Sequence, residues 1–320
     1  MVTDWLTEHD GARIVVEAPA SSANLGAGYD CVGLALAMTD RIEVEVQAGR
    51  HGAIDLSVEG EGDGELPIDH ENRFIRGLTA AIRTARGEVP AAVGWRVAMR
   101  NQIPLSRGLG SSAAATVAGV VAGNALVGDA LTTMEQLRLA TDIEGHPDNA
   151  AAVLLGGFVV SVAGRGGVDA IRFDAPRDLR AVLFIPELRL STAAMRAALP
   201  PDVPHADATA NLGAVAIGVA GLATGRFDLL ARLTVDRLHE PYRAIVYPQL
   251  PRLVEAARES GALGACLSGA GSTIIAFSDS MAGITRIEAA LVAVAADTDL
   301  PGRVTVVEPR NTGARVVARG

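Results

Sequence analysis

One short segment, PLSRGLGSSA at residues 104–113, constrains the fold more than any other part of the chain. The residues before it, AVGWRVAMR at 92–100, alternate as a strand does, and the alanine-rich run after it predicts a helix through Gly128. Glycines let the backbone approach a ligand closely, and the start of a helix offers unpaired amides and a positive dipole end. The segment therefore predicts a strand, a turn and a helix whose start binds an anion. A capped helix with a tight turn and no ligand remains the alternative.

The chain contains no lysine, since all 28 of its basic residues are arginine. P-loop nucleotide hydrolases need the lysine of G-x-x-x-x-G-K-[ST], and protein kinases need a lysine on a strand. Pyridoxal phosphate enzymes need a lysine for their Schiff base. The composition therefore excludes these three classes, and a phosphate at residues 104–113 would have to be held in another way.

The same segment also fits G-x-G-x-x-A, the dinucleotide fingerprint of NAD enzymes, with Gly108, Gly110 and Ala113. That fingerprint needs an acidic residue about 20 positions further on, at the end of a second strand. Asp129 has nearly the right spacing, but the residues after it predict a helix over 132–144. The context therefore disfavours a dehydrogenase.

Composition and charge limit the kinds of partner that the protein is expected to bind. Hydrophobic residues make up 49% of the 320 residues and charged residues 20%, as in folded globular proteins. A net charge of -9 disfavours a nucleic-acid-binding surface. The first ten residues, MVTDWLTEHD, lack the basic head and apolar run of a secretory signal, and the uncharged stretches are rich in Gly and Ala. Cys31 and Cys266 have no metal-ligand spacing; free thiols are expected, and a single disulfide stays open as the alternative. We expect a cytoplasmic protein with neither nucleic acid nor membrane as a partner.

The order of the predicted strands and helices favours an α+β fold in two domains, because they do not follow a strict βαβ order. The segment GRGG at residues 164–167 breaks the pattern near the middle of the chain. It places an N-terminal domain at residues 12–165 and a C-terminal domain at residues 166–320.

Four motifs occur in order along the chain: PASSANLGAGYD (19–30), PLSRGLGSSAA (104–114), EGHPDNAA (144–151) and CLSGAGSTIIAF (266–277). In sequence and in order they resemble the motifs of the GHMP kinase family of small-molecule kinases, which binds ATP without a P-loop lysine. The matches span most of the chain. The resemblance implies an N-terminal α/β domain like ribosomal protein S5 and a C-terminal ferredoxin-like α+β domain.

The resemblance implies that ATP and Mg²⁺ are the cofactors. The implied ATP-binding residues are Pro104, Leu105, Ser106, Arg107, Gly108, Leu109, Gly110, Ser111, Ser112, Gly269 and Gly271. Glu144 resembles the magnesium ligand of the family, with Ser112 as its partner. Mg²⁺ favours one or two protein oxygens together with phosphate and water, so this small ligand set is plausible.

The first motif resembles the form found in family members that act on L-homoserine, although Ala27 and Tyr29 stand where that form commonly has proline and phenylalanine. Homoserine is a small zwitterion with a terminal hydroxyl, and arginine binds carboxylates through two parallel hydrogen bonds. The resemblance implies these substrate-binding residues: Asn24, Asp30, His146, Asp148, Arg196 and Arg243. The two arginines would hold the carboxylate, and Asn24 and Asp30 the amino and hydroxyl end.

The expected reaction is ATP-dependent phosphorylation of the L-homoserine hydroxyl, giving O-phospho-L-homoserine for threonine synthesis. Asp30 and Asp148 are the candidate catalytic bases, and direct transfer without a base stays open. Two other functions are considered: a family kinase with a mevalonate-like substrate, and a non-catalytic ligand-binding protein of this fold. The resemblance also implies a homodimer.

Overall fold

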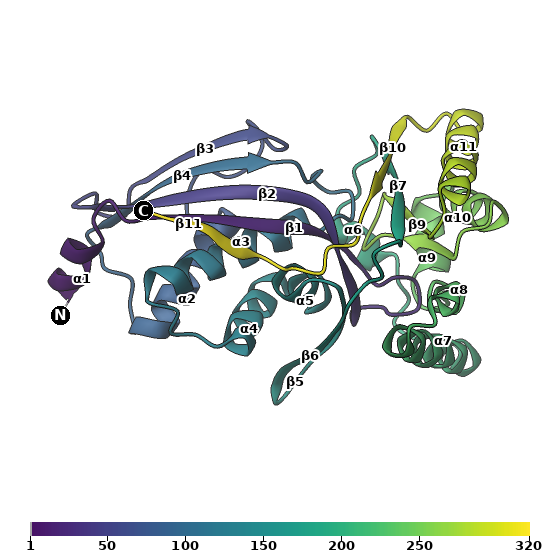
Figure 1. Ribbon diagram of the computed structural model, residues 1–320, viewed down its shortest axis with the longest axis horizontal. Helices are drawn as coiled ribbons and strands as arrows, with labels where there is room; N and C mark the ends of the chain where they lie inside the picture. The colour runs from purple at the N-terminus through teal and green to yellow at the C-terminus, as the bar shows by residue number, and fades with distance from the viewer. Residues whose placement is uncertain (1) are drawn as a thin grey trace.

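The computed structural model describes residues 2–320, which form two sheets with helices packed on each (Figure 1). The first sheet has seven strands in the order β11-β1-β2-β4-β3, with β5 paired to β2 and β6 paired to β5. They are β1 (Arg13–Ala23), β2 (Val32–Ala48), β3 (Ile54–Gly60), β4 (Val93–Asn101), β5 (Phe158–Gly164), β6 (Gly167–Phe173) and β11 (Arg315–Arg319). Pairing is antiparallel except between β3 and β4.

Helices cover one face of this sheet (Figure 1). They are α2 (Arg73–Arg86), α3 (Ser111–Leu126), α4 (Thr133–Glu144) and α5 (Asp148–Leu155), while α1 (Val2–His9) precedes β1. Helix α3 packs against both β1 and α2. Its buried residues lie on nearly all sides, which explains why the run after the second motif consists of small uncharged residues.

The second sheet has four antiparallel strands in the order β10-β7-β9-β8. Its strands are β7 (Arg180–Pro186), β8 (Gly264–Leu267), β9 (Ile274–Ser278) and β10 (Gly302–Val307). Numbered by their order along the chain, the four strands lie in the spatial order 4-1-3-2, and α11 connects β9 to β10. This is a ferredoxin-like arrangement. The predicted α+β class is confirmed.

The remaining helices follow β7 or flank the second sheet. They are α6 (Thr192–Ala197), α7 (His205–Thr224), the 3-10 helix η1 (Phe227–Leu229), α8 (Leu230–Leu233), α9 (Glu240–Val246), α10 (Leu250–Glu259) and α11 (Met281–Asp297). Helices α10 and α11 pack on the sheet around a hydrophobic core of their own.

Helix α7 has the length and apolar composition of a membrane span, and 22% of its most apolar window is buried. One such helix in residues 2–320 is weak evidence for a span. The expected lack of a membrane partner stays a prediction.

The GRGG segment, on which the predicted domain boundary rests, is the turn of the β5–β6 hairpin. Both strands of the hairpin belong to the first sheet, and so does β11 near the end of the chain, because it pairs with β1. The chain therefore returns to the first sheet after completing the second. The domain bounds 12–165 and 166–320 stay a prediction.

Candidate functional site

Three loops that carry the motifs meet around one cavity of about 180 Å³, which we term the motif cavity. We define the first-motif loop as residues 24–31, the second-motif loop as residues 104–110 and the third-motif loop as residues 268–273. The predicted site residues that line the cavity are Asn24, Asp30, Pro104, Ser106, Arg107, Gly108, Leu109, Gly110, Ser111, Ser112, Glu144, His146, Asp148, Arg196, Arg243 and Gly269. Leu105 lines a neighbouring cavity instead, and Gly271 lies against the side chain of Leu267.

Helix α3 begins at the motif cavity without a side-chain cap. Its N-cap residue is Gly110, whose φ of 72° is left-handed, and no side chain among the described residues caps the helix. Ser111, Ser112 and Ala113 in the first turn line the cavity. Because the first amides of a helix have no partner within it and lie at the positive dipole end, this position suits an anionic group.

Gly110 is required by packing inside the protein. A Cβ at this position would lie 2.0 Å from Ser21 Oγ and 3.1 Å from Asn149 Oδ1. Ser21 Oγ donates to Asn149 Oδ1 at 2.8 Å, so the second-motif loop closes directly over this pair. The sequence explained the glycine at position 110 by close approach of a ligand. Packing against Ser21 and Asn149 is a second reason.

The second-motif and third-motif loops are in direct contact. Ser268 Oγ donates to Gly108 O at 2.6 Å, and Thr273 N–H donates to Arg107 O at 3.2 Å. A Cβ on Gly108 would lie 2.0 Å from Ser268 O. The third-motif loop therefore lies over the same cavity as the start of α3.

Glu144 ends α4 with its carboxylate directed at α3. Its Oε1 accepts from Ser112 Oγ at 3.0 Å and from Thr116 Oγ1 at 2.6 Å, and Arg73 NH1 lies 3.6 Å away. The Glu144 side chain is 6% exposed. The predicted pair Glu144 and Ser112 is thus in contact, and it fits a cation that needs a carboxylate, a hydroxyl and phosphate oxygens.

Arg196, one of the two predicted carboxylate-binding residues, is already paired. Its NH1 and NH2 donate to the two carboxylate oxygens of Asp30 at 2.9 and 2.7 Å, and NH1 also donates to the Tyr29 hydroxyl at 2.8 Å. These two predicted substrate ligands therefore bind each other. An incoming carboxylate has to compete with Asp30 for Arg196.

Arg243 is different, because part of its guanidinium is unpaired. Arg243 is 1% exposed, and its NH1 donates to Gly269 O at 2.9 Å and contacts His239 Nδ1 at 3.0 Å. Its buried Nε has no hydrogen-bond partner in residues 2–320. The Nε–H and the adjacent NH2 group form the edge with which arginine binds a carboxylate side-on. Burial lowers the pKa of Arg243, as expected for a desolvated cation.

Asn24 joins the first-motif and third-motif loops. Its Nδ2 donates to Gly269 O at 2.8 Å, and its Oδ1 accepts from Asp30 N–H at 3.0 Å. Asn24 is 3% exposed. Its side chain therefore shapes the cavity wall, and one amide hydrogen remains for a ligand.

His146 and Asp148 form a pair at the start of α5. His146 Nδ1 lies 2.7 Å from Asp148 Oδ1, which also accepts from Asn149 N–H at 2.7 Å. Because a carboxylate accepts, Nδ1 carries the hydrogen, and Nε2 of the neutral ring is left with a lone pair. The hydrogen bond to Asp148 raises the pKa of His146.

The contact between His146 and Asp148 predicts a raised pKa for His146 that histidine NMR can measure. His146 is expected to titrate above the ordinary histidine value of about 6.5, and Asp148→Asn is expected to lower that pKa by removing the carboxylate. A pH titration of the His146 ring resonances in the parent and in the variant measures both values. An unchanged His146 pKa in the variant would contradict the assignment.

A second cavity, which we term the side cavity, borders the second-motif loop and has about 270 Å³. It shares Ser106, Ser111 and Ser112 with the motif cavity. Asn101 Oδ1, on its wall, is a buried acceptor without a partner in the described chain. The two cavities therefore share a wall at the start of α3.

Asp40 also lines the side cavity and ties β2 to the residues before the second-motif loop. It is 1% exposed, and its Oδ1 accepts from Gln102 N–H at 2.7 Å and from Ile103 N–H at 3.1 Å. Burial raises the pKa of Asp40 to about 7, although the two hydrogen bonds act to lower it. The protonated carboxyl is therefore favoured in the fold.

Asp40→Asn is expected to change how stability depends on pH. The pKa of Asp40 is about 7 in the folded protein and about 4 in the unfolded chain. The stabilising contribution of Asp40 is therefore fully present below about pH 4 and is lost as the pH rises through about 7. Asparagine retains the acceptor and does not ionise, so the variant should be more stable than the parent at pH 8 by roughly 2–4 kcal/mol. Urea unfolding at pH 5 and pH 8 measures this difference. Parallel stability curves for the two proteins would refute it.

Four residues at the site carry only weak sequence signals. Thr116 lies one turn after Ser112 on α3, and this i+4 spacing is the signal that could have found it. Tyr29 lies between Arg196 and Arg243, with guanidinium carbons 5.6 and 5.5 Å from its ring centre. Asn149 lies within EGHPDNAA and His239 stands four residues before Arg243, but their partners Ser21 and Gly26 belong to a distant segment.

Comparisons with known proteins agree on one family. Residues 73–157 match the family model "GHMP kinases N terminal domain", and residues 219–296 match the family model "GHMP kinases C terminal". A homoserine kinase of Corynebacterium efficiens is 45% identical over 276 residues, covering 84% of this chain and 86% of the relative. A homoserine kinase of Moorella thermoacetica is 39% identical over 95% of this chain and 99% of its own length.

Solved structures agree with this result. The homoserine kinase from Cytophaga hutchinsonii superposes with a TM-score of 0.83 at 30% identity, covering 95% of this chain and 97% of that one. A mevalonate kinase of L. major, at 17% identity and a TM-score of 0.65, shows the fold alone. The fold and the lysine-free loop at a helix start define an ATP-dependent kinase that acts on a hydroxyl group. The chain belongs to the GHMP kinase family.

Proposed function

We propose that this protein transfers the γ-phosphoryl group of ATP to the side-chain hydroxyl of L-homoserine, giving O-phospho-L-homoserine and ADP. The observation that carries the proposal is the motif cavity. The uncapped start of α3 faces it, and so does Arg243, whose Nε has no hydrogen-bond partner among residues 2–320. The cavity thus offers one position for a triphosphate and another for a small carboxylate. The homoserine kinases described above support the choice of substrate.

The triphosphate would lie along the second-motif loop and the first turn of α3, where backbone amides and the helix dipole replace a lysine. The nucleoside would occupy the side cavity, which continues from the same turn at Ser111 and Ser112. There the free Asn101 Oδ1 can accept a hydrogen bond from the adenine amino group.

Glu144 and Ser112 would hold Mg²⁺. The buried carboxylate and the serine hydroxyl are hard oxygen ligands, and this sparse set suits an ion that is completed by phosphate and water. When bound, the ion neutralises charge on the phosphate oxygens. Thr116 holds the Glu144 carboxylate in its orientation by donating to the same oxygen as Ser112.

At the substrate end, the Nε and NH2 edge of Arg243 would take the homoserine carboxylate. Arg196 would assist when its pairing with Asp30 loosens, because the freed Asp30 carboxylate can then accept from the ammonium group. Asn24 lies beside both groups and would donate its remaining amide hydrogen.

The hydroxyl proton leaves as the oxygen attacks the γ-phosphorus. Asp30 is a weak candidate for its acceptor, because both of its oxygens are bound by Arg196. Asp148 would act through His146, whose Nε2 lone pair is free while Nδ1–H is held by the carboxylate. Direct transfer without a base is the alternative, and an unchanged pH profile in Asp148→Asn would favour it.

A substrate panel tests the proposed function. Purified protein is incubated with Mg-ATP and L-homoserine, mevalonate, galactose or L-threonine, and ADP release is followed together with the mass of the product. We expect ADP release with L-homoserine, together with a product heavier by one phosphoryl group. No ADP release above the rate without acceptor, or faster turnover of mevalonate, would overturn the proposal.

We also propose the homodimer implied by the family resemblance and a cytoplasmic location. Sedimentation equilibrium of the full chain measures the first. A mass equal to one chain at micromolar concentration would contradict it.

A further inference from the structure

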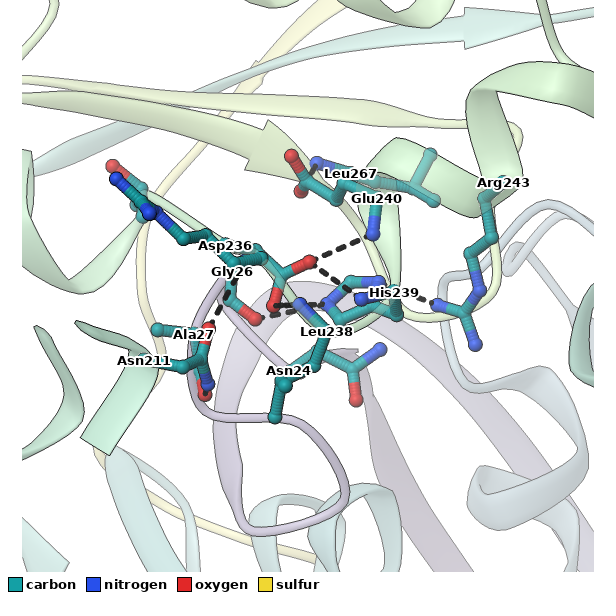
Figure 2. Close-up of polar contacts among 12 residues, drawn as sticks. Asn24, Gly26, Ala27, Asn211, Asp236, Leu238, His239, Glu240, Arg243 and Leu267 are labelled. Carbon is teal, nitrogen blue, oxygen red and sulfur yellow. Dashed lines mark hydrogen bonds and ion pairs between the residues drawn. The ribbon is translucent and has the colours of Figure 1, made fainter. Parts of the chain in front are cut away.

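Helix α9, which carries Arg243, is fixed by buried polar contacts on both sides (Figure 2). At its start, Asp236 Oδ2 accepts from the N–H groups of His239 and Glu240, both at 2.7 Å. The Glu240 carboxyl accepts from Leu267 N–H at 2.7 Å, at the end of β8. This short helix is therefore tied to the strand that leads into the third-motif loop.

His239 lies at the centre of this network, between the first-motif loop and Arg243 (Figure 2). Its Nε2 is 2.9 Å from Gly26 O, and its Nδ1 is 3.0 Å from Arg243 NH1. A carbonyl oxygen can only accept and a guanidinium can only donate. His239 therefore carries its hydrogen on Nε2 and accepts from Arg243 through Nδ1.

The surroundings of His239 keep its ring neutral. The side chain is fully buried, and burial, together with the charge of Arg243, lowers the pKa of His239 to about 4. Asp236 Oδ1, 3.7 Å from Nε2, acts in the opposite direction, as does Asp30 at longer range. At neutral pH the ring thus remains an acceptor for Arg243.

The contacts of Arg243 NH1 decide which edge of the guanidinium remains for a ligand. His239 and Gly269 O both contact NH1, whereas Nε, which shares the opposite edge with NH2, has no hydrogen-bond partner among residues 2–320. The same imidazole holds Gly26 O, and Asn211 Nδ2 holds the next carbonyl, Ala27 O, at 2.7 Å. The first-motif loop and Arg243 are therefore fixed relative to each other.

We propose that His239 is a positioning residue for the substrate: it holds Arg243 with the Nε and NH2 edge toward the motif cavity and couples that edge to the first-motif loop. This inference rests on the proposed function, because it assigns the edge to the homoserine carboxylate. A histidine that only fills the core would have no such effect on substrate affinity.

Two variants test the contacts of the two ring nitrogens of His239 one at a time. In His239→Gln the amide nitrogen replaces Nε2, and no acceptor remains for Arg243. In His239→Asn the amide oxygen replaces Nδ1, and the contact with Gly26 O is lost instead. We expect His239→Gln to raise the KM for L-homoserine about tenfold, with the KM for ATP changed less than about twofold. His239→Asn keeps the acceptor for Arg243 and loses the contact with Gly26 O, so it should raise the KM for L-homoserine less than His239→Gln does, by about threefold, and lower the melting temperature.

A double-mutant cycle tests whether His239 acts through Arg243. On an Arg243→Lys background, His239→Gln should raise the KM for L-homoserine by less than about twofold, since the edge that it orients is already gone. Equal effects of Gln and Asn, a parallel rise of both KM values, or a full tenfold effect on the lysine background would overturn the inference.

A measurement on the parent protein covers the case in which the variants do not fold. Nitrogen-15 NMR of labelled histidine is expected to show His239 as the neutral Nε2–H tautomer from pH 6 to 8, and an Nδ1–H tautomer would contradict the inference. This readout does not need turnover. A parent protein inactive on homoserine with the expected tautomer would therefore refute the proposed function, whereas an active parent with the wrong tautomer would refute the role of His239 alone.

Discussion

Arg243→Lys is expected to raise the KM for L-homoserine about 100-fold and to leave the KM for ATP within about twofold. Lysine keeps the positive charge but has no Nε–H beside a second donor group, so it loses the donor that has no hydrogen-bond partner in the described residues. Losing a buried, charge-assisted pair of hydrogen bonds costs about 3 kcal/mol, which corresponds to about 100-fold in affinity. Steady-state kinetics with each substrate varied in turn measure both constants.

Arg252→Lys is the matched control for that variant. Arg252 is an exposed arginine on α10 that pairs with Asp297 at 2.6 Å, and it does not line the motif cavity. Its replacement should leave both KM values unchanged. If Arg243→Lys raised the KM values for ATP and homoserine together, Arg243 would not be the carboxylate-binding residue.

Glu144→Gln is expected to lower kcat at least about 100-fold and to raise the Mg²⁺ concentration needed for half-maximal rate, because a neutral amide is a poorer ligand for a divalent cation. Ser112 and Thr116 can still donate to the amide oxygen, so the fold should be retained. Initial rates over a magnesium titration, with the melting temperature as a check on folding, give both quantities.

Glu135→Gln on the same helix controls for the loss of one acidic charge. Glu135 closes the capping box with Thr132 at the other end of α4, where glutamine can take its place. Its magnesium dependence should match that of the parent. A Glu144→Gln enzyme with parental kcat and parental magnesium dependence would remove Glu144 from the metal site.

The local parts of the site could be predicted from the sequence because several signals agree there. The predicted helix over 132–144 is confirmed as α4, since Thr132 and Glu135 form a capping box and Gly145 ends the helix with a φ of 86°. The start of α3 is likewise marked by Gly110 and a run of small residues. Each of these signals lies within a few residues of the feature that it predicts.

Contacts between distant segments could not be predicted in this way. Asp30 and Arg196 are 166 positions apart, and the motifs around them assign both to the substrate without indicating that they pair. His239 and Gly26 are 213 positions apart, and only the folded backbone brings that carbonyl to the imidazole. The place of β11 in the first sheet is of the same kind, because an edge strand next to β1 has no local marker for its partner.

A crystal structure with a non-hydrolysable ATP analogue, Mg²⁺ and L-homoserine tests the central claim most directly. We expect the triphosphate at the amides that open α3, with Glu144 beside the metal, and the homoserine carboxylate on the Nε and NH2 edge of Arg243. A nucleotide bound elsewhere, with the start of α3 free of phosphate, would contradict the account.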